Sequence, residues 1–366
     1  MPCLNEAETL ASCIQKAQFF LKNNNLYGEV IVADNGSTDG SQQIALDNNA
    51  VVVNVPLKGY GSAIRGGVQA AQSEYIIVGD SDDSHDLENL ELFYQHLKNG
   101  LDLVVGNRFK GGLNKQDMPF MHRYIGNPVL TGLGNLFFKT KIGDFHCGLR
   151  GLTKSAFNTM NLATTGMEFA SEMIVKAKLN NLKIIEVPTK VFPSGRSRAA
   201  HLQTWPDGWR HLRFLLLYSP KWLFFYPGFI LGAIGVVLMV LLMLNKFNGA
   251  VELLYGLSSA LMLGGFQFVL FYALTKIYAT NHGLIPQSKN YQSIFTKFTL
   301  ERGLVFGFLL MVVSVLSILI NINFSTLGLE NKPMVFIALV SSCLSIQIVL
   351  FSFFFSILGL KGNTSN

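Results

Sequence analysis

The first half of the chain carries short apolar runs that alternate with helical patterns of apolar and polar residues. Apolar runs of this length, bounded by polar residues, predict strands that are buried on both faces of a sheet. Helical segments between successive strands predict that most of the strands run parallel. The expected strands are 29–34, 50–55, 75–80, 102–107 and 183–188, and the expected helices include 8–21, 40–46 and 62–71. We therefore predict an α/β domain over residues 1–200.

The second half carries four much longer apolar runs, none of which contains a charged residue. Each reaches the length of about 20 residues that crosses the hydrocarbon core of a bilayer. These runs predict transmembrane helices at about 223–244, 253–275, 303–324 and 334–360. A second, all-α domain of four transmembrane helices is therefore expected over residues 223–360.

The loop between the second and third predicted spans, 276–302, is the most basic connection in this half, with three lysines and one arginine. Basic loops stay on the cytoplasmic side of a membrane. With four spans, both termini and the α/β domain are then expected on the cytoplasmic side of the cell (inner or plasma) membrane.

Residues 201–222 join the two predicted domains and have the pattern of an amphipathic helix. Its apolar stripe consists of Trp205, Trp209, Leu212 and Leu216. An aromatic stripe with basic neighbours is typical of a helix that lies in the membrane interface. We favour this interpretation over its alternative, an ordinary core helix of the α/β domain.

Composition supports the division into two halves. Of the 366 residues, 49% are hydrophobic and only 14% are charged, and residues 223–366 contain just seven basic and three acidic residues. Soluble chains carry about 25% charged residues, so a wholly soluble protein is excluded. The net charge of +6 is too small to indicate a nucleic-acid partner. The four cysteines form neither a metal-binding pattern nor a disulfide framework.

The start of the chain suggests an incomplete sheet. The segment PCLNEAETL resembles the loop and helix that follow a first strand, yet only Met1 precedes it. A sheet without that strand would leave buried backbone groups of its neighbour unpaired. We therefore expect the first strand to be missing and the native start to lie upstream.

Polar clusters follow three of the predicted strands, at 33–40, 79–86 and 106–109. Parallel sheets bind ligands beyond the carboxyl ends of their strands, so these clusters are expected to share one crevice. The second cluster holds four carboxylates within seven residues: Asp80, Asp82, Asp83 and Asp86. Such carboxylates repel one another unless they are solvated or neutralised, and oxygen ligands suit Mg²⁺ or Mn²⁺. A plain acidic turn is the alternative.

Several motifs occur together in a fixed order. They are PCLNE (2–6), DNGSTDG (34–40), KGYGSAIRGG (58–67), DSDD (80–83), GNRF (106–109), HRYIGNPVL (122–130), DFHCGLRGL (144–152) and GRSR (195–198). This set resembles the family two glycosyltransferases, which have the Rossmann-like GT-A fold. The later motifs are similar to the branch that glycosylates polyprenyl phosphates, such as dolichol-phosphate mannose or glucose synthases and undecaprenyl-phosphate glucosyltransferases.

The resemblance implies roles for individual residues. Asp80 and Asp82, which form the D-x-D motif, are implied to bind the metal or the diphosphate. Asp82 is also implied to be a catalytic residue. An acid is usual at the position of Asn35, so the identity of the nucleotide base stays open. The other implied residues are Glu6, Asp34 and Asn35 for the nucleotide, Arg108, Arg123 and Arg198 for phosphates, and Asp144 and Arg150 near the acceptor.

The implied reaction moves a sugar from a nucleotide-sugar, with UDP-sugars favoured, to a polyprenyl phosphate, with inversion at the anomeric carbon. Asp144 is the candidate general base, although positioning can be its whole role. A processive polysaccharide synthase is one alternative, but the Q-x-x-R-W motif of those enzymes is absent and residues 203–209 read QTWPDGW. A non-catalytic scaffold or flippase that keeps the fold is another, and a homo-oligomer is left open.

Three further groups are open between a site role and a structural one. The glycines of 58–67 could cradle a phosphate, but KGYGSAIRGG matches neither the G-x-G-x-x-G nor the P-loop consensus. Glu168 and Glu172, one helical turn apart, could bind sugar hydroxyls or position an arginine. A metal role is not favoured for the histidines beside the motifs, which are His85, His122 and His146.

Overall fold

The computed structural model describes residues 1–112, 118–197, 203–247, 249–287, 291, 298–325 and 331–361. They form two compact units, Met1–Leu215 and Leu216–Asn366. The first unit contains the predicted α/β domain, and the second contains the predicted transmembrane helices.

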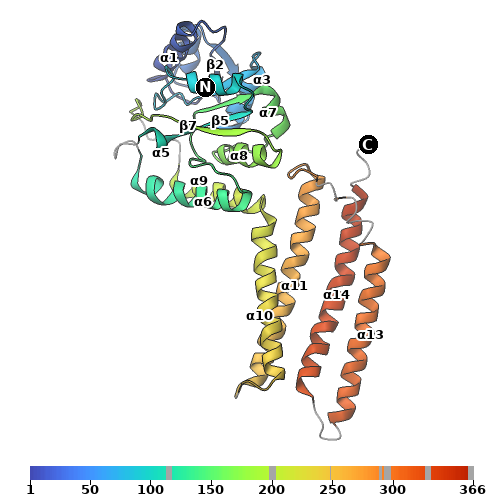
Figure 1. Cartoon of the computed structure of the whole chain (residues 1–366). Coiled ribbons are helices and arrows are strands. Elements are labelled where there is room, and N and C mark those ends of the chain that lie inside the picture. Colours follow the sequence, from blue (N-terminus) through green and yellow to red (C-terminus); the bar gives the residue numbers. More distant parts are fainter. Residues whose placement is uncertain are drawn as a thin grey trace. The chain divides into compact units, whose positions relative to one another are not determined.

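The first unit is built around two sheets (Figure 1). One is fully parallel with the order β1-β2-β3, and the other has the order β4-β6-β5-β7, in which β6 runs antiparallel to both neighbours. The five predicted strands are confirmed to within two residues. The strands of the described residues are β1 Pro2–Cys3, β2 Ile31–Asp34, β3 Val51–Asn54, β4 Tyr75–Val78, β5 Leu103–Asn107, β6 Arg150–Thr153 and β7 Ile184–Pro188.

The first strand is present, although the sequence predicted that it would be missing. Pro2 and Cys3 pair in parallel with β2. The carbonyls of Met1 and Cys3 accept hydrogen bonds of 2.8 Å from the amides of Ala33 and Asn35. Residues 1–3 thus pair with this edge of β2, and a segment of this length is too short to give an apolar pattern.

Helices surround the sheets of the first unit, and their apolar faces form its core. Cys13, Phe93, Leu97 and Val104 are among the residues of the largest described core cluster, which brings α1 and α4 against β5. The helices are α1 Leu10–Asn23, α2 Ser41–Asp47, α3 Tyr60–Ala70, α4 Glu91–Lys98, α5 Arg108–Gly111, α6 Asn127–Phe138, α7 Lys154–Met160, α8 Phe169–Leu179 and α9 Thr204–Leu217, with a π-helical segment η1 at His122–Gly126.

Helix α9, which the sequence predicted, has one buried and one exposed face. On the buried face, Nδ1 of His211 lies 2.8 Å from Oγ of Ser171 on α8, and Leu215 is fully buried. On the other face, 77% of Trp205 and 59% of Trp209 remain exposed. Helix α9 and η1 are joined by a contact of 2.9 Å between Nε2 of His122 and Oγ1 of Thr204. The aromatic stripe is thus not part of the core.

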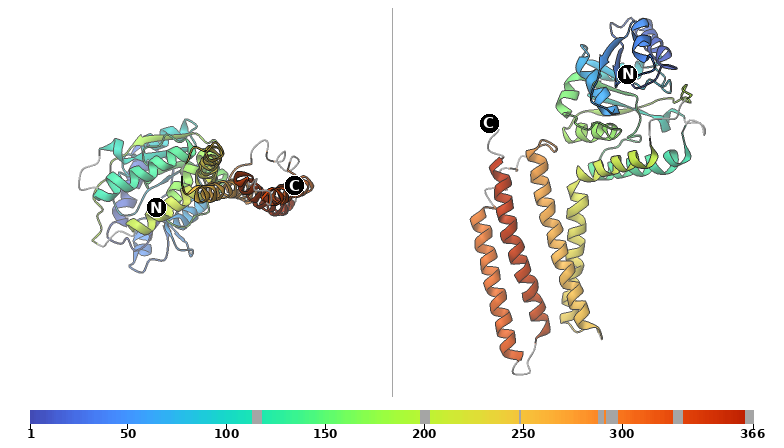
Figure 2. Two further views of the ribbon diagram at one scale, coloured as in Figure 1. Left: turned by 90° about the horizontal axis from the view of Figure 1, so that it is seen from below. Right: turned by 180° about the vertical axis from the view of Figure 1, so that it is seen from behind.

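The second unit consists of long apolar helices, four of which within the described residues are long and apolar enough to cross a membrane (Figure 2). Their bounds are α10 Tyr226–Met243, which follows a π-helical segment η2 at Lys221–Phe225, α11 Val251–Asn281, α13 Leu300–Ser325 and α14 Lys332–Lys361. All four predicted spans are confirmed, and α11 extends six residues beyond its predicted end. Glycines allow helices α10 and α11 to pack closely. A Cβ on Gly265 of α11 would lie 2.4 Å from the backbone nitrogen of Gly232 on α10.

Candidate active site

A cavity of about 820 Å³ opens in the first unit. The segments that follow β2, β4 and β5 all contribute to its lining, as the strand-end clusters predicted, through Asn35, Asp80 and Arg108. Another part of the lining comes from η1, α6 and α9 and mixes apolar side chains with polar ones such as Asp207 and Arg210. Its apolar members include Ile125, Val129 and Trp209.

Asp80 is held in the cavity by two side chains that sequence reasoning did not assign. Its Oδ1 accepts a hydrogen bond of 2.9 Å from the hydroxyl of Tyr60, and its Oδ2 lies 3.0 Å from Nε2 of His85. Burial would raise the pKa of Asp80, but the contacts with His85 and Tyr60 and the charge of Arg108 bring this pKa below its usual value. Asp80 is therefore a fixed, charged carboxylate.

Asp82 also lines the cavity, and an arginine neutralises it. Its Oδ1 accepts hydrogen bonds from the amide and hydroxyl of Ser84, at 3.1 and 2.5 Å. Its Oδ2 lies 3.0 Å from Nη2 of Arg196, whose Nη1 donates to Oε1 of Glu6 at 2.9 Å. Arg196 thus bridges two carboxylates. The segment that carries it is fixed by a backbone hydrogen bond of 3.0 Å from Gly195 to Asp82.

The other two carboxylates of the acidic cluster have partners outside the cavity. Asp83 pairs with Lys16 of α1 at 2.7 Å, and Asp86 accepts hydrogen bonds from Asn89. The predicted repulsion among the four carboxylates is therefore reduced, because each has a partner of its own. Of the four, only Asp80 and Asp82 line the cavity. Within the described residues, no cluster of three acidic, histidine or cysteine side chains could hold a metal ion. Two carboxylates still fit a cation such as Mg²⁺ whose remaining ligands are water and substrate phosphates.

At the end of β2, Asp34 and Asn35 have different surroundings. Asp34 is fully buried and accepts hydrogen bonds from Gln42 and from the amides of Gly36 and Ser37, so it does not line the cavity. Burial opposes its ionisation, but the hydrogen bonds from Ser37 and Gln42 bring the pKa of Asp34 below its usual value. Asp34 therefore shapes the loop that follows it.

Asn35 lines the cavity and clamps the segment after β3. Its Nδ2 donates to the carbonyls of Val55 and Leu57, both at 2.9 Å, and its Oδ1 accepts from the amide of Gly59 at 2.7 Å. An amide fits these three partners, whereas a carboxylate would place an oxygen against two carbonyl oxygens. The amide at position 35 thus has a local structural cause.

Replacing Asn35 with Asp is expected to lower the free energy of unfolding by about 1–3 kcal/mol, because the buried carbonyl of Val55 and the partly buried carbonyl of Leu57 would lose their donor. Thermal unfolding of the purified protein measures this. The exposed Asn158 on α7 provides the control, since Asn158→Asp changes the same chemical group at the surface. Equal stability of both variants would contradict the clamp.

Arg108 and Asp144 form a bidentate ion pair. Nε and Nη2 of Arg108 donate to the two carboxylate oxygens at 2.7 and 2.9 Å, and the amide of His146 donates to Oδ1 at 3.1 Å. Asp144 is fully buried, and the neighbouring Arg108 outweighs this burial and lowers the pKa of Asp144. Arg108 lines the cavity, whereas Asp144 does not. The geometry favours positioning over proton transfer as the role of Asp144.

The remaining predicted arginines do not gather at the cavity. Arg150 is buried, and its guanidinium donates to the carbonyls of Phe145, Cys147 and Ala170 at 2.6–2.9 Å. Three of its five N–H groups are thus used by the backbone, and Arg150 does not line the cavity, so its place near the acceptor stays a prediction. Arg123, on η1, lies over the ring of Tyr124 at 5.4 Å and does not line the cavity. Arg198 lies outside the described residues.

The glycine-rich segment and Glu172 make structural contacts. A Cβ on Gly59 would lie 2.2 Å from the carbonyl oxygen of Thr165, and that oxygen accepts a hydrogen bond of 2.8 Å from the amide of Gly61. The first amides of α3 are therefore not free to cradle a phosphate. Glu172 pairs with Lys176 and accepts hydrogen bonds from the 163–164 backbone, so it binds this loop rather than an arginine.

Comparison with known proteins identifies the family of this chain. Residues 1–160 match the family Glycosyl transferase family 2, and residues 273–359 match the Glycosyltransferase family 2 C-terminal transmembrane region. The Low-salt glycan biosynthesis hexosyltransferase Agl6 of Haloferax volcanii is 35% identical, over 98% of this chain and 88% of that protein. The chain belongs to glycosyl transferase family 2. It is a membrane glycosyltransferase, as the sequence motifs implied.

Other similar proteins have lower sequence identity. Glycosyltransferase AglJ of Haloferax volcanii is 28% identical over 77% of this chain and 93% of that protein. The Dolichol-phosphate mannosyltransferase of Pyrococcus furiosus is 26% identical over 51% of this chain and 54% of that protein. A crystal structure of glucosyl-3-phosphoglycerate synthase from Mycobacterium tuberculosis with Mn²⁺ and UDP-glucose is 22% identical, with a TM-score of 0.44 over 59% of this chain and 74% of that chain.

Proposed function

We propose that this family 2 glycosyltransferase moves a sugar from a nucleotide-sugar, a UDP-sugar in preference, to a polyprenyl phosphate. The transfer uses Mg²⁺ or Mn²⁺ and inverts the anomeric carbon, at the cytoplasmic face of the cell membrane. The observation that carries the proposal is a cavity with charged groups at Asp80, Asp82 and Arg108 and with apolar side chains of η1, α6 and α9 in another part of its lining. A nucleotide-sugar fits the first part, and a lipid fits the second.

The charged part suits a reaction between two anions. A divalent cation held by Asp80 and Asp82 would offset the charge of the departing diphosphate. Arg108 presents the rest of its guanidinium to the cavity while Asp144 fixes its orientation, which suits phosphate binding. A phosphate monoester is largely ionised at neutral pH, so the acceptor needs no strong general base. The buried ion pair of Asp144 is consistent with that.

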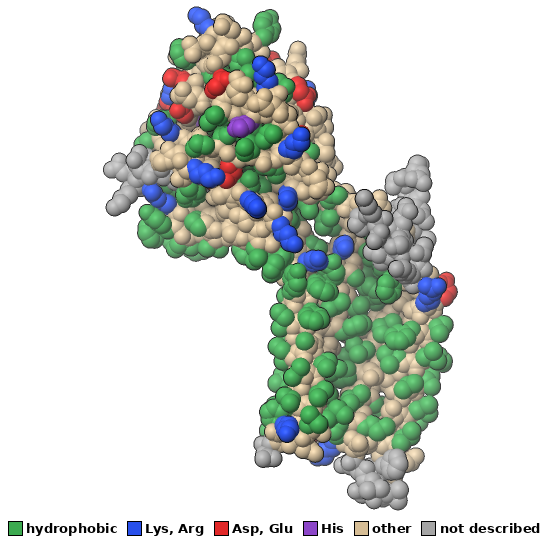
Figure 3. Space-filling view, in the orientation of Figure 1, with side chains coloured by type: hydrophobic (Ala, Val, Ile, Leu, Met, Phe, Trp, Pro, Cys, Tyr) green, Lys and Arg blue, Asp and Glu red, His purple; other side chains and the backbone are tan. Residues whose placement is uncertain are grey.

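The apolar part suits a lipid acceptor at a membrane surface. Trp205 and Trp209 on α9 and Ile125 and Val129 on η1 and α6 are all exposed, by 46–77%. Hydrophobic side chains line the edge of the first unit where α6 lies (Figure 3). Exposed apolar helix faces of this kind fit a membrane interface, with the phosphate of a lipid at headgroup depth.

The direct test incubates membranes containing the protein with labelled UDP-glucose, UDP-N-acetylglucosamine, UDP-galactose or GDP-mannose. Label that enters the chloroform phase from one donor supports the proposal and identifies the sugar. Label in a polymer would instead indicate a processive synthase. No transfer from any donor would indicate a scaffold or flippase. Membranes without the protein serve as the control.

The double variant Trp205→Ser/Trp209→Ser is expected to raise the KM for polyprenyl phosphate at least about tenfold, because two exposed aromatic anchors are lost. The KM for the nucleotide-sugar should stay unchanged. Steady-state kinetics in lipid vesicles measure both. Phe19→Ser, which removes an aromatic side chain that is 55% exposed on α1, is the matched control. An equal rise in both KM values would contradict the lipid role of α9.

Arg196→Gln is expected to increase the affinity for Mn²⁺ without nucleotide by roughly three- to tenfold, because the guanidinium competes with a cation for Asp82. Electron paramagnetic resonance of free Mn²⁺ measures this binding directly. Arg65→Gln removes an arginine that does not line the cavity and should change nothing. Unchanged or weaker Mn²⁺ binding in Arg196→Gln would argue against a cation at Asp82.

A further inference from the structure

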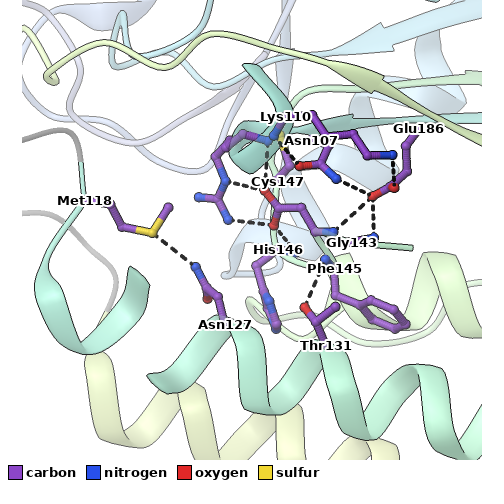
Figure 4. A network of polar contacts seen from close by, with 12 residues as sticks. Asn107, Lys110, Met118, Asn127, Thr131, Gly143, Phe145, His146, Cys147 and Glu186 are labelled. Carbon is purple, nitrogen blue, oxygen red and sulfur yellow. Dashed lines mark hydrogen bonds and ion pairs between the residues drawn. The ribbon is translucent and has the colours of Figure 1, made fainter. Parts of the chain in front are cut away.

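His146 stands out among the residues that line the cavity. It lies two residues after Asp144, whose carboxylate holds its amide, and its ring points toward α6 (Figure 4). Both ring nitrogens are shielded from solvent, and neither has a hydrogen-bond partner within the described residues. Buried polar groups in native proteins are almost always paired, so an imidazole of this kind that lines a cavity points to a ligand.

The neighbours of His146 fix its ring without using its nitrogens. The ring of His211 on α9 meets it edge to face, with centroids 4.6 Å apart and planes at 81°. His211 is itself held by the hydroxyl of Ser171 on α8. The ring of His146 is therefore packed in place before any ligand arrives.

The electrostatic surroundings keep this ring neutral. Burial first, and then the charges of His211, Arg108 and Arg150, lower the pKa of His146 well below its usual value. A neutral imidazole offers one N–H donor and one acceptor nitrogen. An ionised phosphate only accepts hydrogen bonds and would leave the acceptor nitrogen unmatched, whereas hydroxyl groups both donate and accept.

We propose that His146 hydrogen-bonds a hydroxyl group of the transferred sugar and thereby helps to select the donor sugar. This inference rests on the proposed function. The position of His146 agrees with this role, because His146 lines the cavity together with Arg108, which follows β5, and His211 of α9. The reacting sugar must occupy the region between the donor diphosphate and the lipid phosphate.

The experiment takes the donor that labels lipid in the assay above and compares it with its monodeoxy analogues. The wild-type enzyme should lose about tenfold or more in kcat/KM with one analogue, the one that lacks the contacted hydroxyl. His146→Phe keeps an aromatic ring against His211 but has no ring nitrogens. It should lose about tenfold or more on the parent donor and discriminate between parent and analogue by a ratio near one.

Two further variants separate recognition from damage to the fold. His146→Asn restores a donor and an acceptor and should recover part of the discrimination. His96→Phe makes the same change on α4, away from the cavity, and should behave as wild type. Thermal unfolding of each variant shows whether it is folded.

Several outcomes would overturn the inference. His146→Phe with the wild-type pattern of discrimination would do so, and so would a change confined to the KM for polyprenyl phosphate, which would assign His146 to the acceptor phosphate. A wild-type enzyme that labels lipid from no donor would contradict the proposed function itself, and the role of His146 with it.

Discussion

Asp82→Asn should reduce sugar transfer by about a hundredfold or more, because removal of one charge-stabilising group from an active site typically costs this much. Asn has nearly the shape of Asp and keeps an oxygen for Ser84, which now holds Oδ1 of Asp82 at 2.5 Å. It carries no charge, so it binds a divalent cation weakly and does not pair with Arg196. The loss should therefore appear in kcat with saturating donor and should be reduced in part by a higher Mg²⁺ or Mn²⁺ concentration.

Asp83→Asn is the matched control for this experiment. Asp83 is the next residue, but its carboxylate pairs with Lys16 on α1 instead of facing the cavity. A partly exposed pair of this kind contributes little, about 0–1 kcal/mol, so this variant should keep its activity. Both variants should remain folded and bound to membranes. Full activity in purified Asp82→Asn would remove the metal assignment.

The elements with strong apolar patterns could be predicted from sequence, and the short ones could not. The strands near 31–34 and 103–107 and the four long apolar helices carry uninterrupted runs whose burial decides their structure. Strand β6 reads Arg-Gly-Leu-Thr and is a strand because β4 and β5 pair with it on both sides. Pairing with these neighbours makes the segment a strand, although the residues of β6 alone have no pattern that predicts one.

The same limit applies to the site. Asp80, Asp82 and Arg108 were predicted to line one cavity because each lies at or just after the end of a predicted strand. The carboxyl ends of neighbouring parallel strands meet at the same edge of a sheet. Which way a side chain points depends on partners far along the chain: the contact between Arg196 and Glu6 spans 190 residues. Motif order therefore placed Arg150 near the acceptor, and only the structure shows that three of its N–H groups bind backbone carbonyls. Tyr60 lies within a motif and His85 beside one, and only their contacts with Asp80 reveal a role.

Asp144→Asn tests the most consequential of these assignments and should lower the free energy of unfolding by about 3–5 kcal/mol, because it leaves the Arg108 guanidinium without its buried counter-charge. Arg108→Met/Asp144→Leu removes both charges and should be more stable than Asp144→Asn, since no unpaired charge remains. Lys110→Met is the control, because the ammonium of Lys110 is mostly exposed where it pairs with Glu186. Denaturant or thermal unfolding of the full chain in detergent measures all of them.

The pH dependence of this difference separates an ion pair from a general base. The pKa of Asp144 is lowered in the folded protein. The ionised carboxylate therefore contributes its full stabilisation above the usual carboxyl pKa of about 4. This stabilisation is lost as the pH falls through the lowered pKa of the folded protein. The gap in stability between wild type and Asp144→Asn should therefore be constant from about pH 6 to 8 and shrink in acid. If Asp144→Asn instead kept its stability and lost activity with a shifted pH profile, Asp144 would be the base, and Arg108 would not depend on it for its position.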